Sequence, residues 1–355
     1  MNAIRKFSGF VRGIAMRDVS LTRLCAACVI VLALLLLGLE DPSRFLSAAN
    51  LGSMMRQMPE LGVLTLAVSF ALFLGGIDLS VVSTANLSGI VAALLAAKLS
   101  AGGTAEGAAV AVSYAVALLI GAVCGLFNGL VISYAGVPAM LATLGTMELF
   151  EGIGLVLTNG SAVTGLPKAY GAFGSAMIAG VPLIMIVFLL VLIVASVTMS
   201  RRKFGLDIYL LGTNDTAARF SGINNNAVTI KAFVCSGVLA ALAGIIISSR
   251  VMTAKADYGS SYILQCLLVA ILGGISPFGG FGRVVGILVA IITLQMLSSG
   301  FTMMRLSSYQ TQAVWGALLI IVMVSNYLFG KYGEKRRIKK SLKNQKQQME
   351  EANNG

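Results

Sequence analysis

Three carboxylates that could carry chemistry, Asp78, Glu148 and Glu151, stand within or next to long apolar stretches of this 355-residue sequence. In such surroundings an acidic side chain needs a proton, water or a polar partner. Asp78 lies in segment 75–80 between two apolar runs, where its charge can stabilise the start of the following helix. A proton relay or a substrate contact is the alternative. Glu148 and Glu151 are three residues apart and therefore share one face of a helix.

The segment that contains both glutamates, 137–158, is too rich in Gly and Thr to face lipid. It either lines a polar pathway or packs closely against a neighbour, with the carboxylates in structural hydrogen bonds. The candidates for a substrate pathway are Asn128, Thr143, Thr146, Glu148 and Glu151.

Two glycine-rich segments punctuate the sequence, at 74–77 and 272–283. The second resembles a phosphate-binding loop, but it lacks the Gly-Lys-Ser/Thr of a P-loop, so we expect a tight turn. Both contain Leu-Gly-Gly-Ile, an echo that fits two related halves or coincidence equally well. The structural motif residues are Gly76, Asp78, Ser80, Gly273, Gly274, Gly279 and Gly280.

The residue types that most catalytic sites need are missing. The chain has no His and only five Cys, and no Walker A motif, HExxH or nucleophile–His pair. We therefore predict no catalytic residue, no metal site and no cofactor bound by this chain.

Composition predicts the elements that carry these residues. The chain is 57% hydrophobic and 11% charged, whereas soluble domains carry about 25% charged residues. A bilayer core requires roughly 20 apolar residues per helix. We predict an all-α polytopic membrane protein of about ten transmembrane helices, some short or broken: 21–39, 59–76, 81–99, 107–133, 137–158, 181–199, 232–249, 261–275, 284–299 and 313–329.

The basic residues predict the orientation. With the N-terminus inside, 19 of the 26 Lys and Arg fall in cytoplasmic segments and seven outside. We expect a cytoplasmic N-terminus (1–20), a transmembrane domain (21–329) and a basic cytoplasmic tail (330–355) near anionic lipid.

Within the transmembrane domain, segment 200–231 is the longest polar stretch and is cytoplasmic in this topology. Asn214 or Asp215 suits the cap of a short helix and Gly222 suits its end. From the residues alone, this segment is a solvated connector or a docking element.

Four blocks carry a family resemblance. They are Gly76-Ile-Asp-Leu-Ser80; Val137-Pro-Ala-Met-Leu-Ala-Thr-Leu-Gly-Thr146 with Leu157-Thr-Asn-Gly160; the block 212–223; and the block 272–283. In this order they resemble the permease subunits of ABC importers for monosaccharides, the ribose/xylose/galactose branch that includes autoinducer-2 permeases. The resemblance covers roughly residues 20 to 330.

The resemblance implies a bacterial inner-membrane permease that is not itself an enzyme. Its partners would be an ATP-binding cassette ATPase that uses ATP, an extracytoplasmic sugar-binding protein and a second permease copy or paralogue, with no nucleic acid. Block 212–223 matches the loop that contacts the ATPase in that family. The implied coupling residues are Gly212, Asn214, Ala217, Ala218, Arg219, Ser221 and Gly222.

Two residues depart from the family pattern. Val82 stands where the family often has Gly, and Glu151 where it often has Arg, which puts the substrate in doubt. Nucleosides and branched-chain amino acids stay open as substrates. So does a proton-coupled secondary transporter with Asp78, Glu148 or Glu151 as carrier. A membrane-embedded enzyme is disfavoured, since no paired catalytic constellation is visible.

Overall fold

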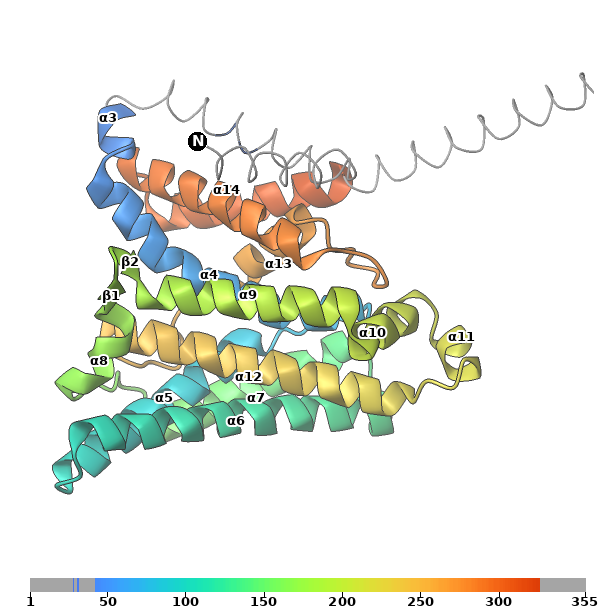
Figure 1. Cartoon of the computed structure of the whole chain (residues 1–355), viewed down its shortest axis with the longest axis horizontal. Helices are drawn as coiled ribbons and strands as arrows, with labels where there is room; N and C mark the ends of the chain where they lie inside the picture. The colour runs from blue at the N-terminus through green and yellow to red at the C-terminus, as the bar shows by residue number, and fades with distance from the viewer. Residues whose placement is uncertain (1–27, 29–30, 32–41, 326–355) are drawn as a thin grey trace, which may run out of the picture.

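The computed structural model describes residues 42–325 together with Cys28 and Val31, and the chain there is almost entirely helical (Figure 1). One short antiparallel pair of strands interrupts the helices. The elements are α3 (Pro42–Phe45), α4 (Ala48–Phe73), α5 (Val81–Ala101), α6 (Glu106–Ala135), α7 (Ala139–Thr158), α8 (Lys168–Ser175), β1 (Met177–Ile178), β2 (Val181–Pro182), α9 (Leu183–Arg201), α10 (Lys203–Thr213), α11 (Asp215–Phe220), α12 (Asn225–Val251), α13 (Tyr262–Leu272), α14 (Val284–Met303) and the helix Ser308–Ser325.

These helices confirm the predicted all-α membrane fold. In the described part of the chain, seven helices are long and apolar enough to cross a membrane: α5, α6, α7, α9, α12, α14 and Ser308–Ser325. Two further predicted spans correspond to α4 and α13. The first predicted span, 21–39, and the boundaries of the two termini lie outside the described residues.

The eighth predicted segment does not cross fully. Helix α13 has 11 residues, or about 16 Å at 1.5 Å per residue, against a hydrocarbon core of about 30 Å. Segment 252–261 before it must therefore descend among the helices as irregular backbone. Asn86 of α5 donates hydrogen bonds to the carbonyl oxygens of Ala256 (2.7 Å) and Tyr258 (2.9 Å). This satisfies backbone groups that lipid could not.

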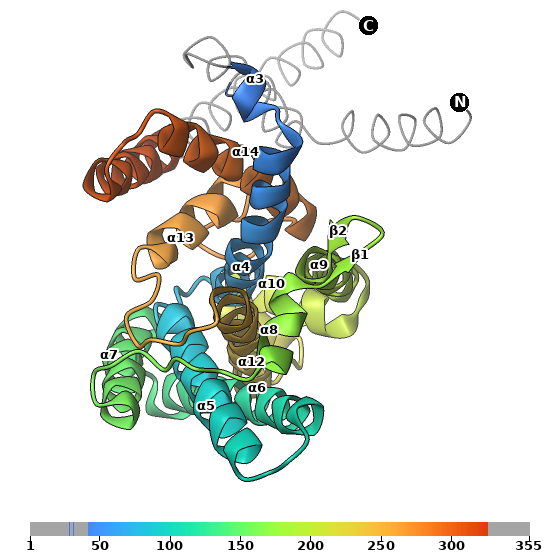
Figure 2. The ribbon, with the colours of Figure 1, turned by 90° about the vertical axis from the view of Figure 1, so that its left-hand side faces the viewer.

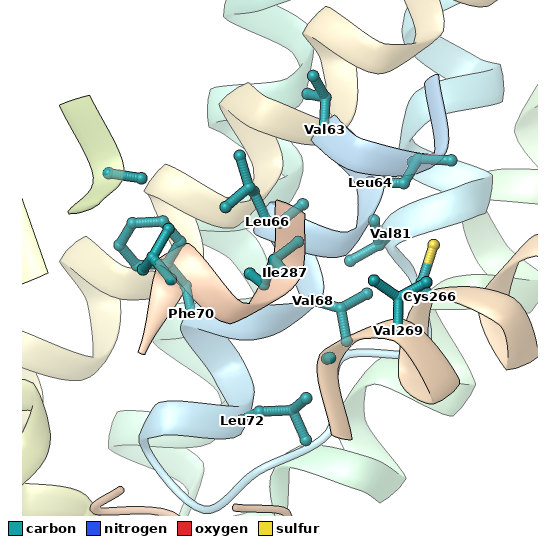
Figure 3. Packing of buried hydrophobic residues seen from close by; sticks show 14 of the residues in the cluster. Val63, Leu64, Leu66, Val68, Phe70, Leu72, Val81, Cys266, Val269 and Ile287 are labelled. Atoms are coloured by element: carbon teal, nitrogen blue, oxygen red, sulfur yellow. The ribbon is translucent and has the colours of Figure 1, made fainter. Parts of the chain in front are cut away.

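Helices α4 and α12 form the middle of the bundle. Figure 2 shows them between a group of α5, α6 and α7 and a second group of α13 and α14. Every residue of α4 from Met58 to Phe73 is buried, as expected of a helix that is apolar on all sides. Figure 3 shows Val68 of α4 close to Cys266 and Val269 of α13, inside the largest hydrophobic cluster.

A glycine seam joins α6 to α12. Gly121, Gly125 and Gly129 recur every four residues along α6, so they share one face. A Cβ on Gly125 would lie 2.2 Å from the carbonyl oxygen of Phe233, and one on Gly121 would lie 2.3 Å from that of Gly237. The two backbones are therefore in direct contact, which is how membrane helices gain packing energy without a hydrophobic driving force.

The two Leu-Gly-Gly-Ile segments end α4 and α13 through the same capping motif. In α4, the amide of Gly76 donates to Ala71 O (3.0 Å) and Gly75 has φ +80°. In α13, the amide of Ile275 donates to Ala270 O (3.0 Å) and Gly274 has φ +90°. Both are Schellman caps, in which glycine takes the left-handed position. The left-handed glycine is the first Gly of the motif in α4 but the second in α13. The repeated Leu-Gly-Gly-Ile therefore marks two similar helix ends, and a two-repeat arrangement stays a prediction.

Candidate functional site: the α10–α11 element and the buried polar groups above it

The polar segment 200–231 contains more helix than the sequence predicted. Besides α11, the structure places α10 in it and begins α12 at Asn225, seven residues before the predicted span. The apolar residues at 204–211 allow this, since Ile208 and Leu211 are buried against the bundle. The bundle thus has an α11 end and, opposite to it, an α8 end (Figure 1).

Local chemistry sets the shape of α11 as the sequence predicted. Asn214 is the N-cap, and its side-chain oxygen accepts from the amide of Ala217 (2.9 Å). Gly222 follows the helix with φ +79°. The Asn225 side chain donates to the carbonyl oxygen of Asp215 (2.9 Å), which ties α11 to the start of α12.

Glycines bring α10 into backbone contact with two other segments. A Cβ on Gly212 would lie 2.0 Å from the carbonyl oxygen of Phe73, at the end of α4. The same oxygen accepts from the amide of Gly280 (3.0 Å). The Tyr209 hydroxyl donates to the carbonyl oxygen of Gly282 (2.8 Å), and burial raises the pKa of this phenol, so it stays protonated as a donor. We call this contact of residues 73–76, 209–213 and 279–282 the glycine junction.

The remaining predicted motif glycines also stand at close approaches. A Cβ on Gly76 would lie 2.7 Å from the Cβ of Ala139, at the start of α7. One on Gly273 would lie 3.0 Å from the backbone of Gly286 in α14, and one on Gly279 would lie 2.6 Å from the amide nitrogen of Gly75. The predicted tight turn at 272–283 is therefore also a packing site.

The predicted coupling residues divide into inward and outward sets. Ala218 is 2% exposed and belongs to the main hydrophobic cluster, whereas Asn214, Ala217, Arg219, Ser221 and Gly222 are exposed. Sequence reasoning missed three aromatic side chains at this end. Phe220 is 89% exposed, Phe278 81% and Phe281 67%. Each could have been found from the sequence as an aromatic residue within a polar or glycine-rich loop, because a loop there has no hydrophobic core in which to bury it.

Asp78 lies in a buried polar cluster between α5, α6 and α12. One carboxylate oxygen accepts from the amide (3.0 Å) and the hydroxyl (2.7 Å) of Ser80, and the other accepts from the hydroxyl of Ser236 (2.9 Å). The Asn128 amide donates to the hydroxyl of Ser80 (2.8 Å). Thr143 accepts from the amide of Leu79 (3.1 Å). The geometry matches the structural alternative for Asp78, and it places Asn128 and Thr143 around the same turn.

The predicted pathway residues on α7 point in two directions. Thr143 and Thr146 are buried against the bundle, but Glu148 is exposed and Glu151 is partly exposed. The single chain therefore leaves both glutamates at least partly uncovered, and their place in a substrate pathway stays a prediction. Helix α7 packs on α5 and α6, and its buried residues are Ala142, Thr143, Thr146, Phe150 and Gly154.

Sequence reasoning also missed an ion pair. The Arg250 guanidinium of α12 donates to the Glu60 carboxylate of α4 at 2.9–3.2 Å, and the Tyr262 hydroxyl donates to it at 3.1 Å. Glu60 is 3% exposed. The three residues hold α4, α12 and α13 together toward the α8 end. No spacing rule joins residues 60 and 250, so the pairing had no sequence signal.

Comparison with known proteins gives one family. The model of the family described as "Branched-chain amino acid transport system / permease component" matches residues 50–323. The ribose import permease protein RbsC of Bacillus subtilis (strain 168) is 33% identical over 292 residues, covering 82% of this chain and 88% of the relative.

Two further relatives are permeases of the same kind of importer. RbsC of Haemophilus influenzae is 32% identical over 290 residues, covering 80% of this chain and 87% of its own. The autoinducer 2 import system permease protein LsrD of Yersinia pseudotuberculosis serotype O:1b is 30% identical over 330 residues, covering 90% and 96%. No solved structure matches the chain.

Proposed function

This chain belongs to the family of permease components of branched-chain amino acid transport systems, within its ABC importer branch for ribose and autoinducer 2, and from that premise we propose that it is the permease subunit of an importer for a neutral sugar. In this proposal the chain is an integral protein of the bacterial inner membrane. It supplies the path, a separate ATPase supplies the energy, and an extracytoplasmic binding protein delivers the sugar.

The α10–α11 element carries the proposal, as the docking site for the ATPase. Its end of the bundle bears Arg201, Arg202, Lys203 and Arg219, all exposed, which fits a cytoplasmic location. Phe220 projects from α11 and is 89% exposed. An aromatic anchor ringed by polar groups is typical of a protein interface, because it fills an apolar pocket on the partner.

The glycine junction gives docking a mechanical consequence. Because α10 touches the end of α4 backbone to backbone, a displacement of α10 by the ATPase moves Phe73 and the turn at 279–282 with it. ATP binding would then bias the permease between two packed arrangements through α4, the most buried helix.

The exposed side of α7 supports assembly with a second permease. Glu148 is exposed and Glu151 partly exposed on the side of α7 that faces away from α5 and α6. Two carboxylates on a membrane helix are costly against lipid. A second copy or a paralogue facing α7 would enclose them in a polar path between subunits, where they could accept hydrogen bonds from sugar hydroxyls.

Reconstitution tests the function. The full chain is co-expressed with candidate ATPase and binding-protein partners, purified, and placed in proteoliposomes with radiolabelled D-ribose, leucine or adenosine. We expect the ATPase to co-purify and ribose uptake to require ATP and the binding protein. ATP-driven uptake of leucine or adenosine instead of ribose would reassign the substrate. Uptake by the chain alone, driven by a pH gradient, would overturn the ABC permease function.

A further inference from the structure

A polar cavity of about 590 Å³ lies between α13, α14 and the helix Ser308–Ser325. It is at the end of the bundle opposite to α11. Helix α14 begins at Val284, just after the glycine junction, and Thr302 on the cavity wall is 18 residues further along, roughly 27 Å away at 1.5 Å per residue. In the proposed topology this is the extracytoplasmic mouth of the permease.

The wall of the cavity is polar but uncharged. Seven of its nine residues carry a hydroxyl or a carboxamide, and the other two are Leu306 and Trp315. Within the described residues no Asp, Glu, Lys or Arg lines it. A site of this kind can replace the water around a neutral polar ligand with hydrogen bonds. It offers an ion no opposite charge.

Much of the hydrogen-bonding capacity of the wall is unused. In the described part of the chain, the side chains of Ser261, Gln265, Ser308 and Gln312 make no hydrogen bond to another protein group. Each glutamine offers two N–H donors and an acceptor oxygen. Gln265 stands on α13 and Gln312 on the last described helix, so a ligand would be contacted from two elements.

Trp315 lies buried beneath this polar wall. It is the single Trp of the chain, it is 3% exposed, and its ring packs at 57° to Phe301 with centroids 5.5 Å apart. The hydroxyls of a sugar both donate and accept hydrogen bonds, and the hydroxyls and carboxamides of the wall supply the complementary groups.

We propose that this cavity is a transient contact site for a neutral polyhydroxylated substrate, a monosaccharide, as it enters the permease. The site rests on the proposed function for its role, but its ligand class follows from the lining itself. Weak binding is a requirement here, because a transport path must release what it holds. Gln265 and Gln312 are the residues that set the preference for hydroxyl-rich ligands over apolar or charged ones.

Trp315 makes the site directly measurable in the full chain in lipid nanodiscs. Its fluorescence is titrated with D-ribose, D-xylose and D-galactose, and with the anion D-gluconate at matched osmolarity. We expect a saturable change for neutral sugars, with a midpoint in the millimolar range, and none for gluconate. In the Gln265→Leu/Gln312→Leu variant we expect the midpoint to rise at least tenfold, as the loss of two or more hydrogen bonds implies.

Gln310→Leu is the matched control. Gln310 lies on the same helix two residues from Gln312 but does not line the cavity. If the double variant does not fold as a monodisperse protein, Ser261→Ala replaces it, with an expected rise of about threefold. Sugar titrations that leave Trp315 emission unchanged, or equal midpoints in wild type and cavity variants, would overturn the site.

Uptake by the reconstituted complex separates this inference from the proposed function. If the wild-type complex transports ribose and the cavity variants transport it with unchanged KM, the site is wrong and the function stands. If the wild-type complex transports no neutral sugar although the cavity binds one, the proposed function is wrong.

Discussion

Gly212 of α10 lies against the carbonyl oxygen of Phe73, so closely that a Cβ at position 212 would stand 2.0 Å from that oxygen. The contact joins a buried helix to one at the surface. Helix α4 is buried for four turns, whereas α10 borders the exposed helix α11. The link between the proposed docking surface and the protein core is therefore a backbone contact that only glycine permits.

Gly212→Ala should uncouple transport from ATP use. The methyl group must displace α10 from Phe73, but it leaves the exposed surface of α11 unchanged. We expect ATP-driven uptake to fall at least tenfold while the ATPase still co-purifies. Gly107→Ala is the control, since nothing lies within 4 Å of a Cβ there. Normal uptake by Gly212→Ala would refute transmission through this contact.

Phe220→Ala should weaken the binding of the ATPase without unfolding the permease. The side chain is 89% exposed, so its removal leaves no cavity. Truncation of an aromatic interface anchor costs about 2 kcal/mol, or roughly 30-fold in Kd. Microscale thermophoresis of labelled ATPase against nanodisc permease measures it. Tyr309→Ala serves for comparison, because Tyr309 is 85% exposed but near the α8 end; equal losses for both variants would contradict docking at α11.

Gly125→Ala should destabilise the fold. Its Cβ would lie 2.2 Å from Phe233 O, so α6 and α12 must separate along the seam. We expect a loss of about 1–3 kcal/mol in the free energy of unfolding, the usual range for overpacking. Gly152→Ala on α7, where the space is open, should be neutral or slightly stabilising. Reversible unfolding in mixed detergent micelles gives both values, and equal values would argue against the seam.

Asp78→Asn should lower stability but not abolish transport per folded molecule. Asparagine has one acceptor oxygen, whereas the Asp78 carboxylate accepts three hydrogen bonds through two oxygens. One buried hydroxyl must lose its acceptor, at a cost of about 1–3 kcal/mol. ATP-driven ribose uptake, normalised to folded protein, should stay within twofold of wild type. A loss of uptake in a fully folded variant would support Asp78 as a proton carrier.

The sequence determined the local and periodic features of this protein. Nine of the ten predicted spans match helices of the described region, because the need to satisfy backbone groups in lipid leaves an apolar run of about 20 residues few other conformations. Asn214 and Gly222 marked the ends of α11, since capping depends on neighbours within a few residues. The family resemblance of block 212–223 pointed to the segment that we propose as the docking element.

Only the tertiary structure decided which distant groups meet. Gly121, Gly125 and Gly129 show their four-residue spacing in the sequence, but the spacing does not name α12 as the partner helix. Glu60 and Arg250 are 190 residues apart, and their contact depends on α4 and α12 lying side by side. The exposure of Glu148 and the uncharged wall around Gln265 have the same origin: the packing of whole helices decides which face of each remains uncovered, and no local pattern encodes that choice.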